Sequence, residues 1–299
     1  IKHPLYPTSK TSNPSMLGAA DTALTVSATD APTISSTDLS GTFNDCAALT
    51  SIGGDWDVSS VTSLTETFKS CSNFNQDIGD WNTGNITTTY RTFNGCGEFN
   101  QNLGAWDMSS NTYMAEMFNG CGEFNNGGSD TIKDWDVSEV ATMIKMFYSC
   151  AKFNQPLDDW DTSSVTRMDF MFANATIFNQ TLNNWNTASA TNIYYMFAFA
   201  SAFNGNISSW NTSSVLNMSN MFVSATNFNQ DISSWDVNQV TDFTNFLQDN
   251  TELSTANYNL LLHHWHADDP LDSKAFHGGD ATTDSSSGGV DGTAARAAL

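Results

Sequence analysis

The stretch MFANATIFNQTLNNWNTASATNIYYM, residues 171–196, runs from one methionine to its counterpart in the next copy of a 25-residue pattern. The pattern recurs along most of the 299-residue chain and can be written V-T-x-M-x-x-M-F-x-x-C-x-x-F-N-Q-x-I-x-x-W-[DN]-x-S-S. A unit of this length cannot bury its apolar face alone, so successive copies must stack. The sequence therefore predicts an α/β repeat solenoid of about eight 25-residue coils.

Large aromatic residues occupy fixed positions in the repeat, and we expect them to form buried ladders along the stack. Two phenylalanine columns run from Phe43 to Phe222 and from Phe74 to Phe228. Stacking would place like residues about 4.8 Å apart, the spacing of neighbouring strands. The tryptophan column consists of Trp56, Trp81, Trp106, Trp135, Trp160, Trp185, Trp210 and Trp235.

Two smaller columns are predicted to be structural. An asparagine follows the second phenylalanine, and we expect its side chain to hydrogen-bond the backbone at a turn. Its members are Asn75, Asn100, Asn125, Asn154, Asn179, Asn204 and Asn229. The cysteines are Cys46, Cys71, Cys96, Cys121 and Cys150, and alanine fills the same position in later copies. This interchange favours a column of buried thiols, with disulfides between neighbouring coils as the alternative.

The apolar spacing within one copy predicts its local structure. Val165, Met168, Met171 and Phe172 follow helical spacing, so this part is expected to form helical turns. The segment Phe-Asn-Gln-x-Ile-x-x-Trp is expected to form a short extended rung. Between the two lies Asp or Asn followed by serines, as at Asp161, which is typical of an Asx turn.

The repeated motif MF-x-x-C/A-x-x-FNQ-x-I/L-x-x-W-D/N-x-S-S-V-T-x-M resembles the BspA-like leucine-rich-repeat surface proteins in their 25-residue bacterial form. The resemblance covers about residues 36–299. It implies a leucine-rich-repeat-like solenoid displayed at or beyond the cell surface, and roles in adhesion or recognition. It implies no particular ligand, because the repeats and not an activity define the family.

Three regions are predicted along the chain. Residues 1–35 match nothing in the repeat and are expected to be a flexible leader or a strand that adds to an exposed edge of the solenoid, in the same or the next subunit. Residues 36–250 form the solenoid. Residues 251–299 contain a cap and tail, because Tyr258, Leu261, Leu262 and Trp265 fall on one face of a helix that would cover the last coil.

One copy contains an insertion. Seven residues separate Phe124 from Ile132, where other copies have three at this point. We expect the extra residues to bulge as a surface loop, which is either a tolerated insertion or a candidate binding loop. The loop consists of Asn126, Gly127, Gly128, Ser129 and Asp130.

Composition excludes several classes of function. The net charge of −22 repels nucleic acid and anionic membranes. No apolar run is long enough to cross a membrane, and no phosphate-binding or nucleophile motif occurs. The recurring Asp column admits Asn at three positions, which a catalytic carboxylate would not tolerate. We therefore expect no enzyme activity, no catalytic or metal-binding residues and no cofactor, with weak calcium binding by stacked carboxylates left open.

Two functions are consistent with the sequence. The first is an extracellular or cell-surface adhesion scaffold that binds a protein or glycan through its polar columns. The alternative is the subunit of a self-assembling extracellular filament, joined head to tail through the N-terminal segment and the solenoid ends.

Overall fold

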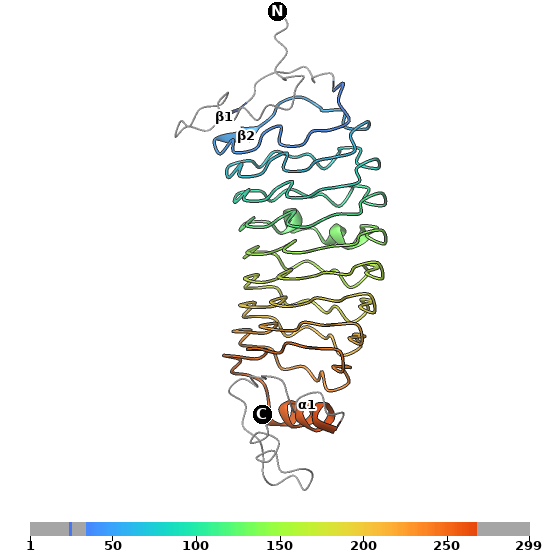
Figure 1. Cartoon of the computed structure of the whole chain (residues 1–299). Coiled ribbons are helices and arrows are strands. Elements are labelled where there is room, and N and C mark those ends of the chain that lie inside the picture. The colour runs from blue at the N-terminus through green and yellow to red at the C-terminus, as the bar shows by residue number, and fades with distance from the viewer. Residues whose placement is uncertain (1–23, 26–33, 268–299) are drawn as a thin grey trace, which may run out of the picture.

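A computed structural model of the chain describes residues 24–25 and 34–267, and these form one elongated stack of repeats (Figure 1). Parallel bridges join each copy to the next, from the pair Asp38–Ser63 to the pair Asn217–Asp242. The bridging residue lies just before the residue that starts the turn segment, which is apolar in every copy except at Thr89. The tandem repeat predicted from the sequence is therefore present as stacked units.

Regular secondary structure is sparse in the described residues. It consists of two short strands, β1 (Leu24–Thr25) and β2 (Leu49–Ser51), two 3-10 helices, η1 (Asn126–Gly128) and η2 (Asp130–Asp134), and one α-helix, α1 (Thr255–Ala267). The expected α/β content is thus found only at the ends of the stack and in the inserted segment.

The expected helical turns are wrong, because the segment forms a chain of β-turns instead. The amide of Met171 donates to the Met168 carbonyl at 3.1 Å, and that of Ala175 donates to the Phe172 carbonyl at 3.0 Å. The amides of Phe170 and Phe172 instead donate to the next copy, at 3.1 and 2.9 Å. Amides therefore alternate between closing a turn and joining two copies, which satisfies the backbone without a helix or a long strand.

Left-handed backbone makes these turns. Phe170 and Asn174 have φ values of 58° and 60°, and the corresponding residues of other copies do the same. A positive φ at the third residue of a turn defines a type II turn. Turns that close every three residues produce the same apolar spacing as a helix, which explains the incorrect prediction.

Among the described copies, the predicted extended rung is found only in the first, where β2 (Leu49–Ser51) occupies the position of Phe-Asn-Gln and pairs with β1. The bridges between copies lie instead at the position of Arg167, before the turn segment. In the Phe-Asn-Gln segment of later copies the asparagine side chain, described below, takes the place of a backbone acceptor. The interchange of Asp and Asn fits the Asx turn expected there, since Asp161 Oδ1 accepts from the Ser163 amide at 3.0 Å and Asn211 Oδ1 accepts from the Ser213 amide at 3.1 Å.

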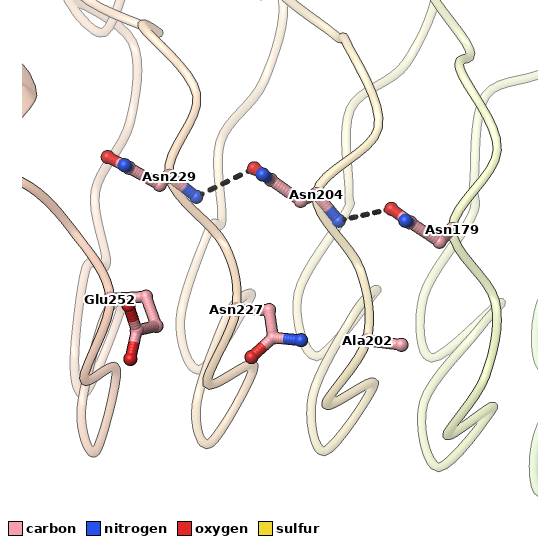
Figure 2. A pocket seen from close by; sticks show the side chains of 6 residues that line it. All are labelled: Asn179, Ala202, Asn204, Asn227, Asn229 and Glu252. Atoms are coloured by element: carbon pink, nitrogen blue, oxygen red, sulfur yellow. Dashed lines mark hydrogen bonds between the residues drawn. The ribbon is translucent and has the colours of Figure 1, made fainter.

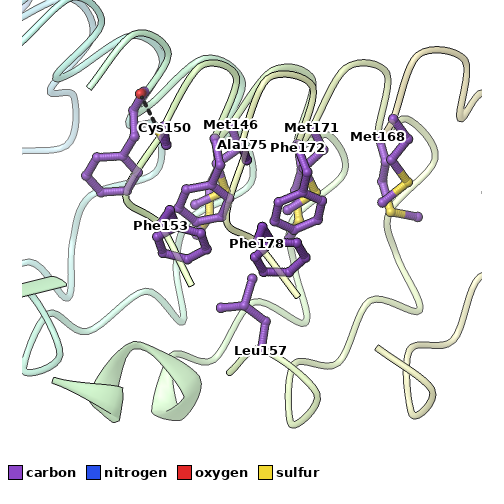
Figure 3. Close-up of a cluster of buried hydrophobic side chains, with 14 of the residues drawn as sticks. Met146, Cys150, Phe153, Leu157, Met168, Met171, Phe172, Ala175 and Phe178 are labelled. Atoms are coloured by element: carbon purple, nitrogen blue, oxygen red, sulfur yellow. Dashed lines mark hydrogen bonds between the residues drawn. The ribbon is translucent and has the colours of Figure 1, made fainter. Parts of the chain in front are cut away.

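One continuous apolar core runs the length of the stack (Figure 3). Rings of the first phenylalanine column stack on their counterparts, as Phe172 does on Phe197 at 5.6 Å between centroids. Within one copy, Phe172 also stacks on Phe178 at 4.1 Å. Ring centroids lie farther apart than the strand spacing of about 4.8 Å because stacked aromatic rings are offset.

Both ends of the stack are covered by described residues. At the N-terminal end, β1 pairs in parallel with β2 of the same chain, with Leu24 opposite Leu49. The rest of the predicted leader, residues 1–23 and 26–33, and the tail from residue 268 lie outside the described residues. At the opposite end α1 packs with Tyr258, Leu261, Leu262 and Trp265 buried (Figure 1).

Candidate functional site

The asparagine column forms an amide ladder along the stack (Figure 2). The side-chain Oδ1 of each asparagine accepts a hydrogen bond from the backbone amide of its counterpart in the next copy. The backbone amide of Asn204 donates to Asn179 Oδ1 at 2.7 Å, and the backbone amide of Asn229 donates to Asn204 Oδ1 at 2.9 Å. The same bond joins each pair of successive asparagines from Asn75 through Asn100, Asn125 and Asn154 to Asn179.

The ladder continues into the cap. Glutamine side chains reinforce it, as Gln230 Nε2 does by donating to the Asn204 carbonyl at 2.9 Å and to its Oδ1 at 2.8 Å. In α1, Asn257 Nδ2 makes the same two bonds to Asn229, and the Ser254 amide donates to Asn229 Oδ1 at 2.9 Å. The cap therefore binds the last copy through the contacts that one copy uses to bind another.

An open hollow of about 330 Å³ lies beside this ladder, lined by Asn179, Ala202, Asn204, Asn227, Asn229 and Glu252 (Figure 2). The Oδ1 atoms of Asn179, Asn204 and Asn229 are occupied by the ladder bonds, whereas Asn227 lies outside the ladder. The hollow therefore combines a structural amide row with one carboxylate, and it contains no pair of acid and base groups suited to catalysis.

The tryptophans are buried and anchored. The indole Nε1 of Trp185 donates to the Leu157 carbonyl of the preceding copy at 2.7 Å, and Trp210 does the same to Leu182 at 2.8 Å. Trp106, Trp135, Trp160 and Trp235 follow this rule, whereas Trp56 donates to Gly53 of its own copy. Trp81 is also buried and stacks on Trp106. These side chains hold copies together and leave no polar group for a ligand.

The five cysteines are free thiols. Cys71, Cys96, Cys121 and Cys150 are buried, and each Sγ donates to a phenylalanine carbonyl of the preceding copy at 2.9 to 3.0 Å. Burial raises the pKa of Cys71 to about 12 and also raises those of the other three buried thiols well above their ordinary value. Cys46, in the first copy, is half-buried. Protonated, enclosed thiols of this kind are poor nucleophiles.

The inserted segment lies at the surface, as expected, because Gly127, Gly128 and Asp130 are exposed. It is not an irregular loop, since it forms the two 3-10 helices η1 and η2. Asn126 anchors it: this residue is fully buried, its Oδ1 accepts from the Leu103 amide at 2.8 Å, and its Nδ2 donates to the Ser129 carbonyl at 2.9 Å.

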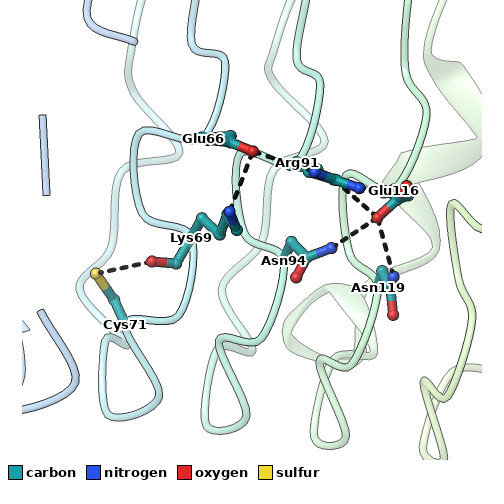
Figure 4. Close-up of polar contacts among 7 residues, drawn as sticks. All are labelled: Glu66, Lys69, Cys71, Arg91, Asn94, Glu116 and Asn119. Carbon is teal, nitrogen blue, oxygen red and sulfur yellow. Dashed lines mark hydrogen bonds and ion pairs between the residues drawn. The ribbon is translucent and has the colours of Figure 1, made fainter. Parts of the chain in front are cut away.

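A second surface was not identified from the sequence. We call it the turn face: the outward side chains of the turn segments in copies 63–70, 88–95, 113–120, 142–149, 167–174 and 192–199. In its first half it carries charge (Figure 4). Arg91 makes a double hydrogen bond to Glu116, at 2.9 and 3.0 Å, and also contacts Glu66 at 3.3 Å. Burial acts to raise the pKa of Glu116, but the hydrogen bonds and charge of Arg91, the hydrogen bond from Asn119 and the charge of Lys145 together outweigh it and hold that pKa below its ordinary value.

The second half of the turn face is aromatic. Phe170 stacks on Tyr195 at 4.6 Å between centroids, and it meets Tyr148 and Tyr194 edge to face at 6.2 and 5.0 Å. Beneath these rings lies a small apolar cluster that is separate from the main core, formed by Ala173, Ala198 and Val223. With Tyr90 and Tyr113, which meet at 5.4 Å, these rings form what we call the aromatic band: Tyr90, Tyr113, Tyr148, Phe170, Tyr194 and Tyr195.

The signal for this band was present in the sequence as a departure from the repeat. Five of the six tyrosines in the described part of the chain lie on the turn face, at positions that the repeat leaves variable. The periodic pattern does not reveal them, because residues that differ from copy to copy leave no repeated signal.

The cap histidines His263 and His264 are exposed, and their rings meet edge to face at 5.5 Å. Within residues 24–25 and 34–267, no three His, Cys, Asp or Glu side chains are grouped to hold a metal ion. No helix in the same ranges is long and apolar enough to cross a membrane.

Comparison with known families agrees with the stacked repeat. Residues 37–131, 127–217 and 182–270 each match the family described as "Mycoplasma protein of unknown function, DUF285". The chain belongs to the DUF285 family. The matches overlap and together run from the first stacked copy into α1, so the matched region is the tandem repeat and the start of its cap. No curated protein matches the chain.

Proposed function

We propose that the chain is a non-catalytic interaction scaffold at the cell surface or outside the cell, a leucine-rich-repeat-like solenoid of the BspA-like kind. The observation that carries this proposal is the contrast between its columns and its turn face. Every copy repeats the same buried residues, while the outward residues of the turn segments differ from copy to copy and include the aromatic band. A rigid stack with a variable, aromatic outer face is suited to recognition and not to chemistry.

The ends of the stack favour a single scaffold over the filament. β1 occupies the edge of β2 within one chain, and α1 binds the final copy through Asn257 and Ser254. Head-to-tail assembly would have to displace one or both of these contacts. Sedimentation of the full chain and of a variant lacking residues 1–35 tests this point, and fibres that form only with the N-terminal segment present would support the filament instead.

The scaffold proposal is tested with beads coated with the purified chain, applied to immobilised surface glycans and matrix proteins. We expect adhesion that disappears in a variant in which Tyr148, Tyr194 and Tyr195 are all replaced by serine. A matched variant with Ser59, Ser109 and Ser163 replaced by alanine, on the Asx turns, should adhere normally. Adhesion that survives loss of the tyrosines, or its absence on every surface, would contradict the proposal.

A further inference from the structure

The turn face differs from the rest of the molecule in charge as well as in its rings. Of the six basic residues in the described part of the chain, four lie on it: Lys69, Arg91, Lys145 and Arg167. Only three of the twenty-four acidic residues in the same part lie there: Glu66, Glu116 and Asp169. On a protein with a net charge of −22, these six segments carry a small excess of basic residues. The equivalent segments of the first copy and the last two copies, 38–45, 217–224 and 242–249, contain four acidic residues and no basic residue, so the basic excess is confined to the middle of the stack.

Lys145 stands out among these cations. Its Nζ lies 5.2 Å from the ring centroid of Phe170 and 5.8 Å from that of Tyr148, so it sits at the edge of the aromatic band. It forms no ion pair with any residue that the structure describes. Arg167, one copy further on, contacts the buried Asp169 at 2.7 Å while its own side chain is about half exposed. Two cations thus flank the rings. Lys145 is within electrostatic reach of Glu116 but not within ion-pair distance of any carboxylate in the described residues.

The aromatic band is shallow. Its inner side is filled by the buried residues Ala173 and Ala198, so it offers no deep pocket for a large side chain at this point. Protein partners typically anchor in such pockets. The rings occupy different positions within their copies, but each of five successive copies carries at least one, from Tyr90 to Tyr195. Neighbouring copies are separated by a strand spacing of about 4.8 Å, which is similar to the length of one sugar unit in an extended polysaccharide.

Two elements of the band match the chemistry of an acidic sugar. The C–H groups of a sugar ring pack against aromatic rings, whose faces are electron-rich. The cations Lys145 and Arg167 would attract a carboxylate beside that ring. The net charge of −22 opposes any polyanion, but charges farther away than about 8 Å are largely screened at physiological ionic strength, so the local cations decide. A carboxylate-bearing polymer meets less repulsion than a densely sulfated one because it carries less charge per sugar. We infer that the aromatic band binds an extended, carboxylate-bearing polysaccharide along the stack.

This inference rests on the proposed scaffold function and names its ligand class. Its test uses the full chain and three uronate polymers, polygalacturonate, alginate and hyaluronate, each beside its carboxyl-esterified form, with binding measured by calorimetry. We expect at least one uronate polymer to bind and its esterified form to bind roughly tenfold more weakly, because esterification removes the charge that Lys145 and Arg167 recognise.

Matched variants locate the site. Lys145→Gln should weaken binding several-fold, and Tyr194→Ser with Tyr195→Ser should abolish it. The control is Lys152→Gln, which removes the same charge. Lys152 also forms no ion pair in the described residues but lies away from the turn face, so this variant should bind as the parent chain does. Thermal unfolding of each variant shows whether the fold is kept, and Lys145→Gln is read alone if the tyrosine variant unfolds.

Several results would overturn the inference. They are the absence of binding to all three polymers, equal binding to the esterified forms, or equal losses in Lys145→Gln and Lys152→Gln. If the chain-coated beads of the previous section adhere to proteins through the tyrosines while all three polymers fail, the ligand class is wrong and the scaffold function stands. If uronate binds but no bead adheres, the site is real and the adhesive role fails.

Discussion

Phe170 and Phe172 are two residues apart, yet they belong to two different regions of the molecule. Phe172 is fully buried and stacks on a phenylalanine in both neighbouring copies. Phe170 is half-buried on the turn face, in a left-handed conformation, where other copies carry Glu, Arg, Lys, Tyr or Asn. The columns therefore determine that the copies stack, and the turn face determines what each copy presents. The four predictions below test how independent the two regions are.

The largest difference is expected from truncating each phenylalanine in turn. Phe172→Ala opens a cavity in the ring ladder and should lower the free energy of unfolding by about 3–5 kcal/mol. Phe170→Gly loses ring contacts but relieves a left-handed conformation that costs an ordinary residue about 1–2 kcal/mol, so its net effect should be small. Urea midpoints of the two variants measure this, and similar losses would mean that the turn face is part of the core.

The amide ladder should show the next largest effect. Asn204→Ala removes the acceptor for the Asn229 amide and for Gln230, and should destabilise by about 1–3 kcal/mol because backbone amides are left without partners. Asn227→Ala, on the neighbouring exposed position of the same hollow, should change stability by no more than about 0.5 kcal/mol (Figure 2). Equal effects would show that the ladder oxygens are replaced by water without loss.

How much of this could be predicted from sequence differs between the regions. The buried columns were identified residue by residue, because burial imposes the same requirement in every copy and so leaves a periodic trace. The β-turn chain was not, because its left-handed positions hold glycine only at Gly41, Gly95 and Gly120 in the described copies and hold Ser, Asn, Phe, Tyr or charged residues elsewhere. The burial of Asn126 in the insertion was missed because it depends on one hydrogen bond, which its Oδ1 accepts from a residue of another copy.

The thiol column predicts a pH dependence. Burial raises the thiol pKa values of Cys71, Cys96, Cys121 and Cys150 above the ordinary value of 9.0. Above pH 9 the unfolded chain loses these protons first, so it binds fewer protons than the folded chain and stability falls as pH rises. Replacing all four by alanine, the residue that later copies use there, should give a folded protein whose urea midpoint falls less between pH 8 and pH 10.5, pH values chosen on either side of that ordinary pKa.

In the same experiment, unchanged alkaline sensitivity in the alanine variant would assign the effect to other groups. Rapid reaction of the native thiols with a small maleimide would show that the column is not enclosed.

The smallest effect is expected on the charged half of the turn face. Glu116→Gln breaks the double hydrogen bond to Arg91 and should cost at most about 1 kcal/mol at low salt, because the pair is partly solvated. High salt should reduce the difference from the parent chain. Glu123→Gln, an exposed acid outside the described ion pairs, is the control. A large loss that salt does not change would place Glu116 among the structural residues.

The way α1 binds the stack has a consequence for the evolution of this chain. Asn257 and Ser254 contact Asn229 with the bonds that an additional copy would make, so the cap fits any copy that ends in the same asparagine. Each copy contacts only its neighbours. A duplication or deletion of one 25-residue unit would therefore leave both ends satisfied, and the length of the protein, along with the number of outward positions open to variation, can change in single genetic steps.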